Sequence, residues 1–364
     1  MRKGLFAVLS LALVAMMVLS ACGPQPTAVP ATKAPATAPV AKIKVGQVTD
    51  VGGIDDRSFN ATAWKGVQDA MAQLGVEGKY LESQQQTDYE RNIREFVDQK
   101  YDLIVTVGFL LGDATKAAAE ANPQQKFAIV DYSYDPALPN VLGLTFATDE
   151  AAFLAGYLAA GMSKTGKVGT FGGIPIPPVT IFMVGFEKGV LYYNQVHGTS
   201  VQVLGWKTDP TAEGCGTGSF TGNFESTDDG RRFATSLMDE GADVIVPVAG
   251  PVGLGSAAAC KERSTMMIGV DTDWYISAPD YKEVYLTSIL KNMDVAVYDA
   301  IAAVVNGTFK GGTYVGTLKN NGVGIAPFHD FDGKVPASLK AEIEQLKADI
   351  IAGKVSTGWA DCFK

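Results

Sequence analysis

Short runs of consecutive apolar residues alternate along the chain with longer segments in which apolar residues recur every three or four positions. In the first half, the runs cover residues 43–49, 101–108 and 126–131, and a helical pattern covers residues 58–74. Strands buried in a parallel sheet are apolar on both faces, and amphipathic helices connect them. The spacing therefore predicts βαβ units that build a doubly wound α/β lobe.

The same alternation starts again in the second half of the chain. A helical pattern covers residues 149–164, and runs of strand length cover residues 167–173, 199–206 and 266–271. Two such modules in tandem predict two lobes with a cleft between them. Ligands of open parallel sheets bind beyond the carboxyl ends of the strands. The acids and glycines that follow predicted strands are Asp50, Gly108, Asp131, Gly173, Gly250 and Asp271.

The N-terminus has the pattern of a secretory signal. Arg2 and Lys3 precede an uncharged apolar run, and the small residues after Leu19 lead to Cys22. This arrangement resembles the lipobox of bacterial lipoproteins, in which cleavage leaves the cysteine as a lipidated first residue. We therefore expect a signal peptide over 1–21, lipidation of Cys22, and a position on the outer, extracytoplasmic face of the cell membrane.

Composition bounds the rest of the chain. Residues 22–42 are rich in proline, alanine and threonine and predict an extended tether. Removing residues 1–21 takes the formal charge from −9 to −11, which argues against nucleic acid as a partner. The three later cysteines show no zinc-site spacing. A disulfide is permitted outside the cell, and we favour Cys215 with Cys260, which would leave Cys362 free.

Catalytic signatures are weak. His197 and His329 occur in no metal-binding or nucleophile motif, and G-x-S-x-G is absent. Residues 250–259, GPVGLGSAAA, half match the dinucleotide fingerprint, but we favour a glycine-rich turn whose backbone approaches a ligand. We therefore expect no catalytic residue, no metal and no cofactor.

The stretch TDVGGIDDRSFN, residues 49–60, sets three acids around two glycines. It lacks the EF-hand pattern, and Arg57 places a positive charge in its middle. We expect Asp56 with Ser58 to cap the following helix and Asp50, at the end of a strand, to contact the ligand. Phe59 lies in this polar loop and can offer its ring to a flat ligand.

Five segments in sequence order resemble the basic membrane protein (BMP) family, the substrate-binding lipoproteins of ABC transporters best known for purine nucleoside uptake. They are VGGIDDRSFNATAWKGV, VGFLLGDATKAAAEANPQQKFAIVD, DEAAFLAGYLAAGMSKTGKVGTFGG, GADVIVPVAGPVGLG and IGVDTDW with TSILKNMDVAV. The resemblance covers about residues 43–330. It implies a type I periplasmic-binding-protein fold, with two Rossmann-like lobes joined by three crossovers near residues 146, 291 and 310.

On this resemblance, lobe 1 comprises residues 43–147 plus 292–310, and lobe 2 comprises 148–291 plus 311–364. Phe59 and Phe224 would stack on the two faces of the base, with Asn60 beside Phe59, while Asp131 would accept hydrogen bonds from the base edge. The residues that would hold the ribose hydroxyls are Gly250, Asp271 and Lys291. Trp206 and Phe220 compete with Phe224 for its role, and Asp273 competes with Asp271.

The resemblance implies a nucleoside receptor that closes like a hinge and delivers its ligand to an ABC permease driven by an ATPase. A receptor for a sugar or another small polar solute is the nearest alternative. A surface nucleoside hydrolase or glycosidase would need two carboxylates across a cleft, and no pair is singled out. A sensor that signals to a membrane kinase is a further alternative.

Overall fold

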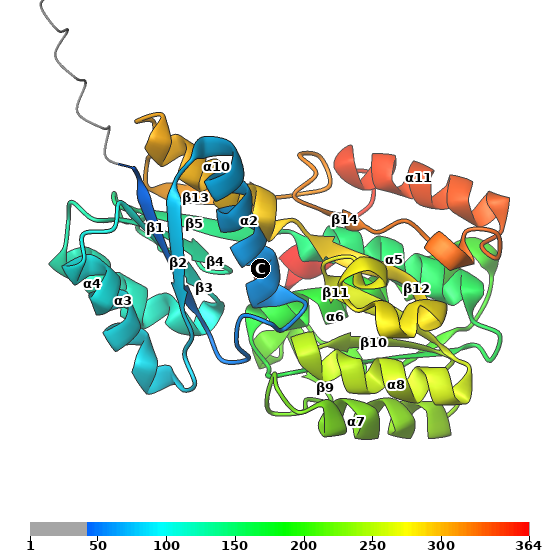
Figure 1. Ribbon diagram of the computed structural model, residues 1–364. Helices are drawn as coiled ribbons and strands as arrows, with labels where there is room; N and C mark the ends of the chain where they lie inside the picture. The colour runs from blue at the N-terminus through cyan, green and yellow to red at the C-terminus, as the bar shows by residue number, and fades with distance from the viewer. Residues whose placement is uncertain (1–41, 364) are drawn as a thin grey trace, which may run out of the picture. The chain divides into compact units, whose positions relative to one another are not determined.

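Two six-stranded sheets organise residues 42–363, which are the residues that the computed structural model describes (Figure 1). The expected signal peptide, Cys22 and nearly all of the tether lie outside these residues. Residues 42–363 belong to a single unit, so the two sheets can be discussed together.

The first sheet is entirely parallel and has the order β13-β5-β4-β3-β1-β2. Its strands are β1 (Lys44–Thr49), β2 (Glu77–Leu81), β3 (Leu103–Val107), β4 (Lys126–Val130), β5 (Val141–Phe146) and β13 (Gly312–Gly316). One face is covered by α2 (Phe59–Leu74) and α10 (Met293–Val305), and the other by α3 (Tyr89–Asp98) and α4 (Gly112–Ala121). This lobe is doubly wound, as predicted.

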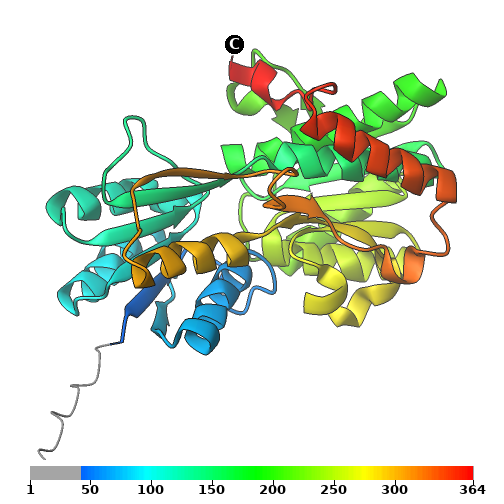
Figure 2. The same cartoon turned by 90° about the horizontal axis from the view of Figure 1, so that it is seen from above.

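The second sheet repeats this plan with the order β14-β12-β11-β10-β6-β7, in which only β14 runs antiparallel. Its strands are β6 (Lys167–Gly172), β7 (Gln202–Leu204), β10 (Val244–Val248), β11 (Met266–Asp271), β12 (Tyr285–Lys291) and β14 (Val323–Ile325). Helices α5 (Thr148–Met162) and α6 (Pro177–His197) cover one face, and α7 (Thr227–Asp239) and α8 (Gly253–Arg263) cover the other. Helix α11 (Ala337–Ile351) packs on α5 (Figure 2).

Two-sided burial explains the continuous apolar runs. In β3, Leu103 and Val105 belong to the core beneath α2 and α10, whereas Ile104 belongs to the core beneath α3 and α4. All three side chains are fully buried. Successive strand residues point to opposite faces, so a strand with helices on both sides needs apolar residues at every position.

The chain passes between the two sheets three times: after β5, after β12, and between β13 and β14. The third passage lies later than the expected position near 310. Gly312–Gly316 pair with Leu142–Phe146 in the first sheet, so the chain leaves that sheet only after residue 316. Residues 311–316, which we expected in lobe 2, therefore belong with the first sheet.

The run 199–206 is not one strand. It forms β7 and the start of β8 (Trp206–Thr208), which pairs with β9 (Gly216–Gly218) as a separate hairpin. Gly205 causes the break, with φ of 80°. A Cβ there would lie 2.1 Å from the carbonyl oxygen of Thr170, so the close approach requires glycine.

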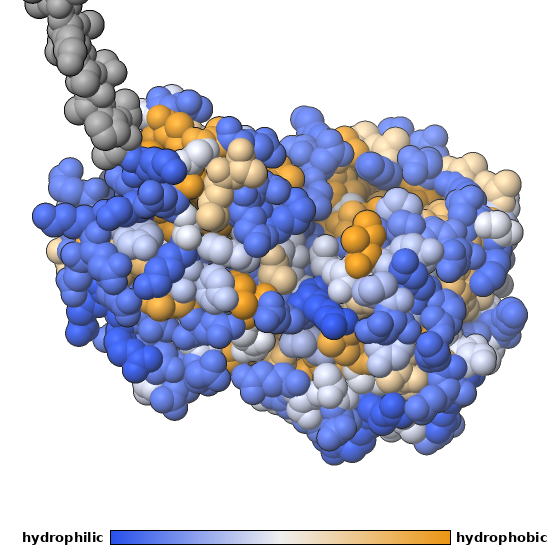
Figure 3. Space-filling model, viewed as in Figure 1, coloured by the Kyte–Doolittle hydropathy of each residue, from blue (hydrophilic) through white to orange (hydrophobic). Residues whose placement is uncertain are grey.

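Among the helices of residues 42–363, none combines the length and the apolar character that crossing a bilayer requires. The face seen in Figure 3 is mainly hydrophilic, and its apolar residues appear as separate small areas.

The predicted pairing of Cys215 with Cys260 is wrong, because the disulfide joins Cys215 to Cys362. Cys215 belongs to the core on the α5 and α6 side of the second sheet, whereas Cys260 belongs to the core on its opposite face. Cys260 is a free, buried thiol, and burial raises its pKa to about 11. The sheet therefore separates the two cysteines that we expected to pair.

Replacing Cys362 with serine is expected to lower the free energy of unfolding by about 2 to 4 kcal/mol, because the disulfide closes a long loop in the unfolded chain. Urea unfolding with and without dithiothreitol measures this. The reductant should shift the midpoint of the wild type and leave that of Cys362→Ser unchanged. A wild-type unfolding midpoint that does not change on addition of the reductant would contradict the prediction.

Asp149 gives the fold a pH-dependent contact with the C-terminal segment. Its carboxylate accepts a hydrogen bond from Thr357, and burial is the main cause that raises its pKa to about 6. The folded state then binds more protons than the unfolded state between about pH 4 and 6. The contribution of Asp149 to stability is therefore largest below this window and falls as the pH rises through it.

The matched variant is Asp149→Asn, which keeps an acceptor without a charge. As the pH rises from 4 to 7, the free energy of unfolding of this variant relative to wild type should increase by on the order of 2 to 3 kcal/mol. Urea unfolding at both pH values measures the difference. Equal differences at the two pH values would contradict this role of Asp149.

Candidate functional site

The carboxyl ends of both sheets border one cavity. It encloses about 600 Å³ between the atoms, its open mouth included. In each sheet the strand order reverses at one point, between β1 and β3 and between β6 and β10, and such switch points are where ligands of open α/β sheets bind. The lining residues that follow strands are Asp50, Val51, Gly108, Phe109, Leu110, Asp131, Ala249, Gly250 and Pro251, and Val248, Val270, Asp271 and Lys291 lie in the strands themselves.

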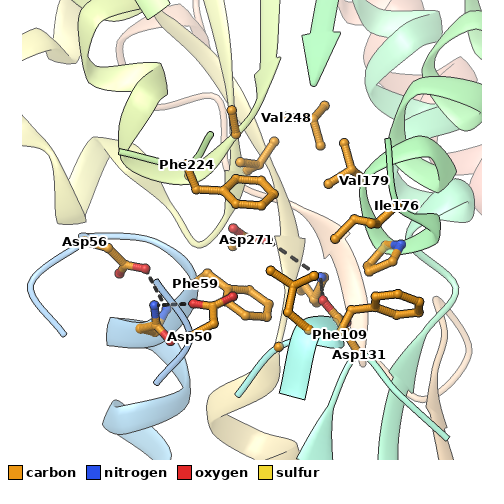
Figure 4. Close-up of a pocket in the computed structure, with 18 of the residues that line it drawn as sticks. Asp50, Asp56, Phe59, Phe109, Asp131, Ile176, Val179, Phe224, Val248 and Asp271 are labelled. Atoms are coloured by element: carbon orange, nitrogen blue, oxygen red, sulfur yellow. Dashed lines mark hydrogen bonds and ion pairs between the residues drawn. The ribbon is translucent and has the colours of Figure 1, made fainter. Parts of the chain in front are cut away.

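Phe59 and Phe224 enter the cavity from different lobes (Figure 4). Phe59 opens α2, and Phe224 lies in the loop that follows β9. Backbone hydrogen bonds hold this loop to the end of β6, where Thr221 N–H donates to Gly172 O (3.0 Å) and Gly222 N–H to Gly173 O (2.8 Å). A Cβ at Gly173 would lie 2.2 Å from the ring of Phe224, so glycine there makes room for the aromatic.

Two carboxylates surround one ammonium group at the centre of the cavity. Lys291 Nζ donates to Asp131 Oδ2 at 2.7 Å and lies 3.9 Å from Asp271 Oδ1. The three side chains are at most 8% exposed. Burial raises the pKa of Asp131 and of Asp271, and the positive charge of Lys291 opposes this rise in both. Buried charges of this kind are stable only when they are paired.

Three aromatic rings border the same ammonium group. Its nitrogen lies 5.0 Å from the ring centroid of Phe59, 5.3 Å from that of Phe182 and 5.9 Å from that of Phe146. A cation near aromatic faces is attracted by the ring quadrupoles. Lys291 is therefore held in position by both the acids and the rings.

Asp50 follows β1 directly and lies beside Asn60 and Gly108. Asn60 Nδ2 donates to Asp50 Oδ1 at 2.9 Å, and a Cβ at Gly108 would lie 2.6 Å from Asp50 Oδ2. Burial raises the pKa of Asp50 well above its usual value. The Oδ1 atom of Asn60 is buried and has no hydrogen-bond partner among residues 42–363.

Asp56 caps α2 by itself. Its carboxylate accepts from the backbone N–H groups of Ser58 (3.0 Å), Asn60 (2.7 Å) and Ala61 (3.0 Å). Burial nevertheless raises its pKa to about 6. The expectation that Ser58 shares this task is wrong, because its side chain makes no capping hydrogen bond. The Ser58 hydroxyl donates instead to Asp271 Oδ2 at 2.8 Å.

Eight of the residues expected at a ligand site line this cavity: Asp50, Phe59, Asn60, Asp131, Phe224, Gly250, Asp271 and Lys291. Trp206 and Asp273 do not. Trp206 is buried in the core and its indole N–H donates to Thr208 Oγ1. Asp273 accepts from Tyr275 N–H and contacts His329 Nε2 at 2.7 Å, so local contacts occupy its carboxylate.

The apolar residues that line one side of the cavity were not predicted from the sequence. Ile176, Pro178, Val179 and Phe182 come from the start of α6, and Phe109 and Leu110 follow β3. Their position in the sequence could have indicated them, because both segments begin directly after a strand that ends at the cleft. Within residues 42–363 no group of three or more His, Cys, Asp or Glu side chains is suited to hold a metal ion.

Comparison with known proteins identifies the family of the chain. The family described as ABC transporter substrate-binding protein PnrA-like matches residues 43–214 and 218–356. The chain is 30% identical to the ABC transporter nucleoside-binding protein BmpA of Lactococcus lactis, covering 98% of this chain and 99% of the relative. It is 33% identical to basic membrane protein A of Borreliella burgdorferi, covering 85% of each.

A solved solute-binding protein of an ABC transporter system from Aeropyrum pernix superposes with a TM-score of 0.77 at 30% identity, covering 86% of this chain and 92% of that one. The lac repressor shares the fold alone. It is 12% identical and has a TM-score of 0.54, covering 79% of this chain and 81% of the repressor chain. The predicted type I periplasmic-binding-protein fold is confirmed. From the family match and these relatives, the chain belongs to the PnrA-like family of ABC transporter substrate-binding proteins, which bind solutes and are not enzymes.

Proposed function

We propose that this protein binds a purine nucleoside between its two lobes and delivers it to the permease of an ABC importer. The observation that carries the proposal is the pair of rings, Phe59 and Phe224, which come from different lobes into one cavity. Two aromatic planes can enclose a flat heterocycle, and each stacked face contributes ~1 to 3 kcal/mol.

The polar groups of the cavity suit the rest of a nucleoside. In this proposal, Asp131 accepts hydrogen bonds from the base edge, and Asp271 accepts from ribose hydroxyls while Lys291 donates to another ribose oxygen. A ligand that leaves these buried groups unpaired binds poorly, which favours ligands rich in donors. The printed name of the Lactococcus lactis relative, a nucleoside-binding protein, supports the same ligand class.

The ligand that copurifies with the protein tests this proposal. Native mass spectrometry after expression in rich medium should show a complex, and denaturation should release a purine nucleoside. A released sugar would favour the alternative receptor. A free base together with ribose would contradict simple binding, because only a hydrolase separates them.

We also propose a lipid anchor at Cys22, which lies outside the described residues. Relatives named lipoproteins in Pyrococcus abyssi and Pyrococcus horikoshii, each 35% identical, support it. Wild-type protein expressed in a bacterial host with radiolabelled palmitate should carry the label, and Cys22→Ser should not. Equal labelling of the two proteins, or no label on either, would exclude lipidation of Cys22.

A further inference from the structure

We propose that Ser58 is a latch between the lobes, which holds Asp271 in its binding orientation and stabilises the closed form through a contact that the ligand does not make. The role rests on the proposed function, in which the closed form retains a nucleoside. Ser58 precedes α2 beside the first sheet, and Asp271 ends β11 in the second sheet. Their hydrogen bond therefore joins the lobes directly.

The geometry of this contact is well defined. Ser58 Oγ lies 2.8 Å from Asp271 Oδ2 and 3.3 Å from Val270 O. A hydroxyl has one proton, and the shorter, charge-assisted bond to the carboxylate takes it. Ser58 is fully buried. When the lobes separate, this bond must break and both groups must meet water.

The local surroundings leave the hydroxyl free for this task. A serine directly before a helix usually accepts a hydrogen bond from the first turn. Here Asp56 accepts from the N–H groups of that turn, and the Ser58 side chain makes no capping bond. Ser58 also does not line the cavity. Its hydroxyl therefore serves the contact across the cleft.

The latch also orients a proposed ligand group. Asp271 has a left-handed backbone with φ of 70°, which sets its carboxylate at the strand end. With Oδ2 bonded to Ser58, the other oxygen, Oδ1, faces Lys291 at 3.9 Å. One oxygen of Asp271 thus bonds to Ser58 across the cleft, and the other remains available to the nucleoside.

The neighbouring Arg57 makes a second contact across the cleft. Its guanidinium nitrogen lies 3.4 Å from Asp280 Oδ2, and both side chains are about half exposed or more. Exposed ion pairs contribute little to stability, because water and salt screen them. We therefore assign the larger part of the latch to the buried Ser58 contact.

The test measures lobe closure in ligand-free protein. Spin labels at Glu120→Cys, in the first lobe, and Glu240→Cys, in the second, report the distance between lobes by pulsed electron resonance. The native thiol of Cys260 is buried and the other two cysteines beyond Cys22 form the disulfide, so the labels are selective. Protein lacking residues 1–41 is unfolded in urea, washed free of ligand and refolded before measurement.

Three substitutions are compared with the labelled wild type. Ser58→Ala should lower the ratio of closed to open protein about tenfold, since a hydrogen bond to a charged group is lost. Ser58→Thr keeps the hydroxyl and should show the same ratio of closed to open protein as wild type. Ser256→Ala, which removes a buried hydroxyl bonded to Gly230 O within the second lobe, should leave the ratio unchanged.

With a nucleoside bound, Ser58→Ala should raise the dissociation rate about tenfold and change the association rate less than twofold, because closure follows capture. The latch is refuted if Ser58→Ala and wild type give the same lobe distances, or if Ser256→Ala shifts them equally. Because the distance measurement uses no nucleoside, it is independent of the ligand proposal. A protein that closes through Ser58 but binds no nucleoside would overturn that proposal and leave the latch intact.

Discussion

Lys291→Met is expected to lower the free energy of unfolding of ligand-free protein by about 3 to 5 kcal/mol at pH 7.5. The Lys291 ammonium lies 2.7 Å from Asp131 Oδ2 in a site where both side chains are nearly inaccessible to water. Removing it leaves two carboxylates, Asp131 and Asp271, buried without their cation. Methionine fills a similar volume, so the loss reports the charge and not a cavity.

Two comparisons separate this effect from general damage to the fold. The double variant Lys291→Met with Asp131→Asn removes the unpaired charge and should recover at least half of the lost stability. The loss in the single variant should also shrink at pH 5, since protonation neutralises the buried acids. Urea unfolding at both pH values measures this. A single variant as stable as wild type would show that the pair contributes nothing.

Truncating both rings, by Phe59→Ala with Phe224→Ala, is expected to raise the Kd for a purine nucleoside at least ~30-fold. Each stacked face contributes ~1 to 3 kcal/mol, and tenfold corresponds to about 1.4 kcal/mol. Each single truncation should therefore raise the Kd at least ~5-fold. Asp271→Ala should also do so, because it removes a charged acceptor from the ligand.

Phe220→Ala is the matched control for the rings. Phe220 lies in the same loop as Phe224, but its ring contacts Trp206 edge-on and does not line the cavity. This variant should bind with a Kd within about threefold of wild type. Calorimetry measures the affinities, and circular dichroism confirms that each variant is folded. Unchanged affinity in both Phe59→Ala and Phe224→Ala would refute the stacking site.

The repeating elements were predictable because buried parallel strands leave a two-sided apolar pattern. The run at Leu103–Val107 is one example, since all five side chains are buried. Residues at strand ends were predictable for the same reason: Asp131 and Asp271 follow or end such runs and reach the cavity. Their positive φ values, 64° and 70°, fit aspartate better than most residues.

The predictions that were wrong concern residues whose partners are decided by contacts between segments far apart in the sequence. Cys215 and Cys260 belong to cores on opposite faces of one sheet, which spacing along the chain does not reveal. Trp206 begins β8, in the hairpin that precedes the Phe224 loop, yet only packing decides which ring is buried in the core. Ser58 matched a capping pattern, while its actual partner lies 213 positions away in the other lobe.

Calorimetric titration of ligand-free protein with adenosine, guanosine and inosine, beside uridine, cytidine and ribose, tests the central claim most directly. We predict saturable binding of at least one purine nucleoside with a stoichiometry near one, weaker binding of pyrimidine nucleosides, and no heat from ribose. Absence of binding with every nucleoside, or tight binding of ribose alone, would contradict the proposed function.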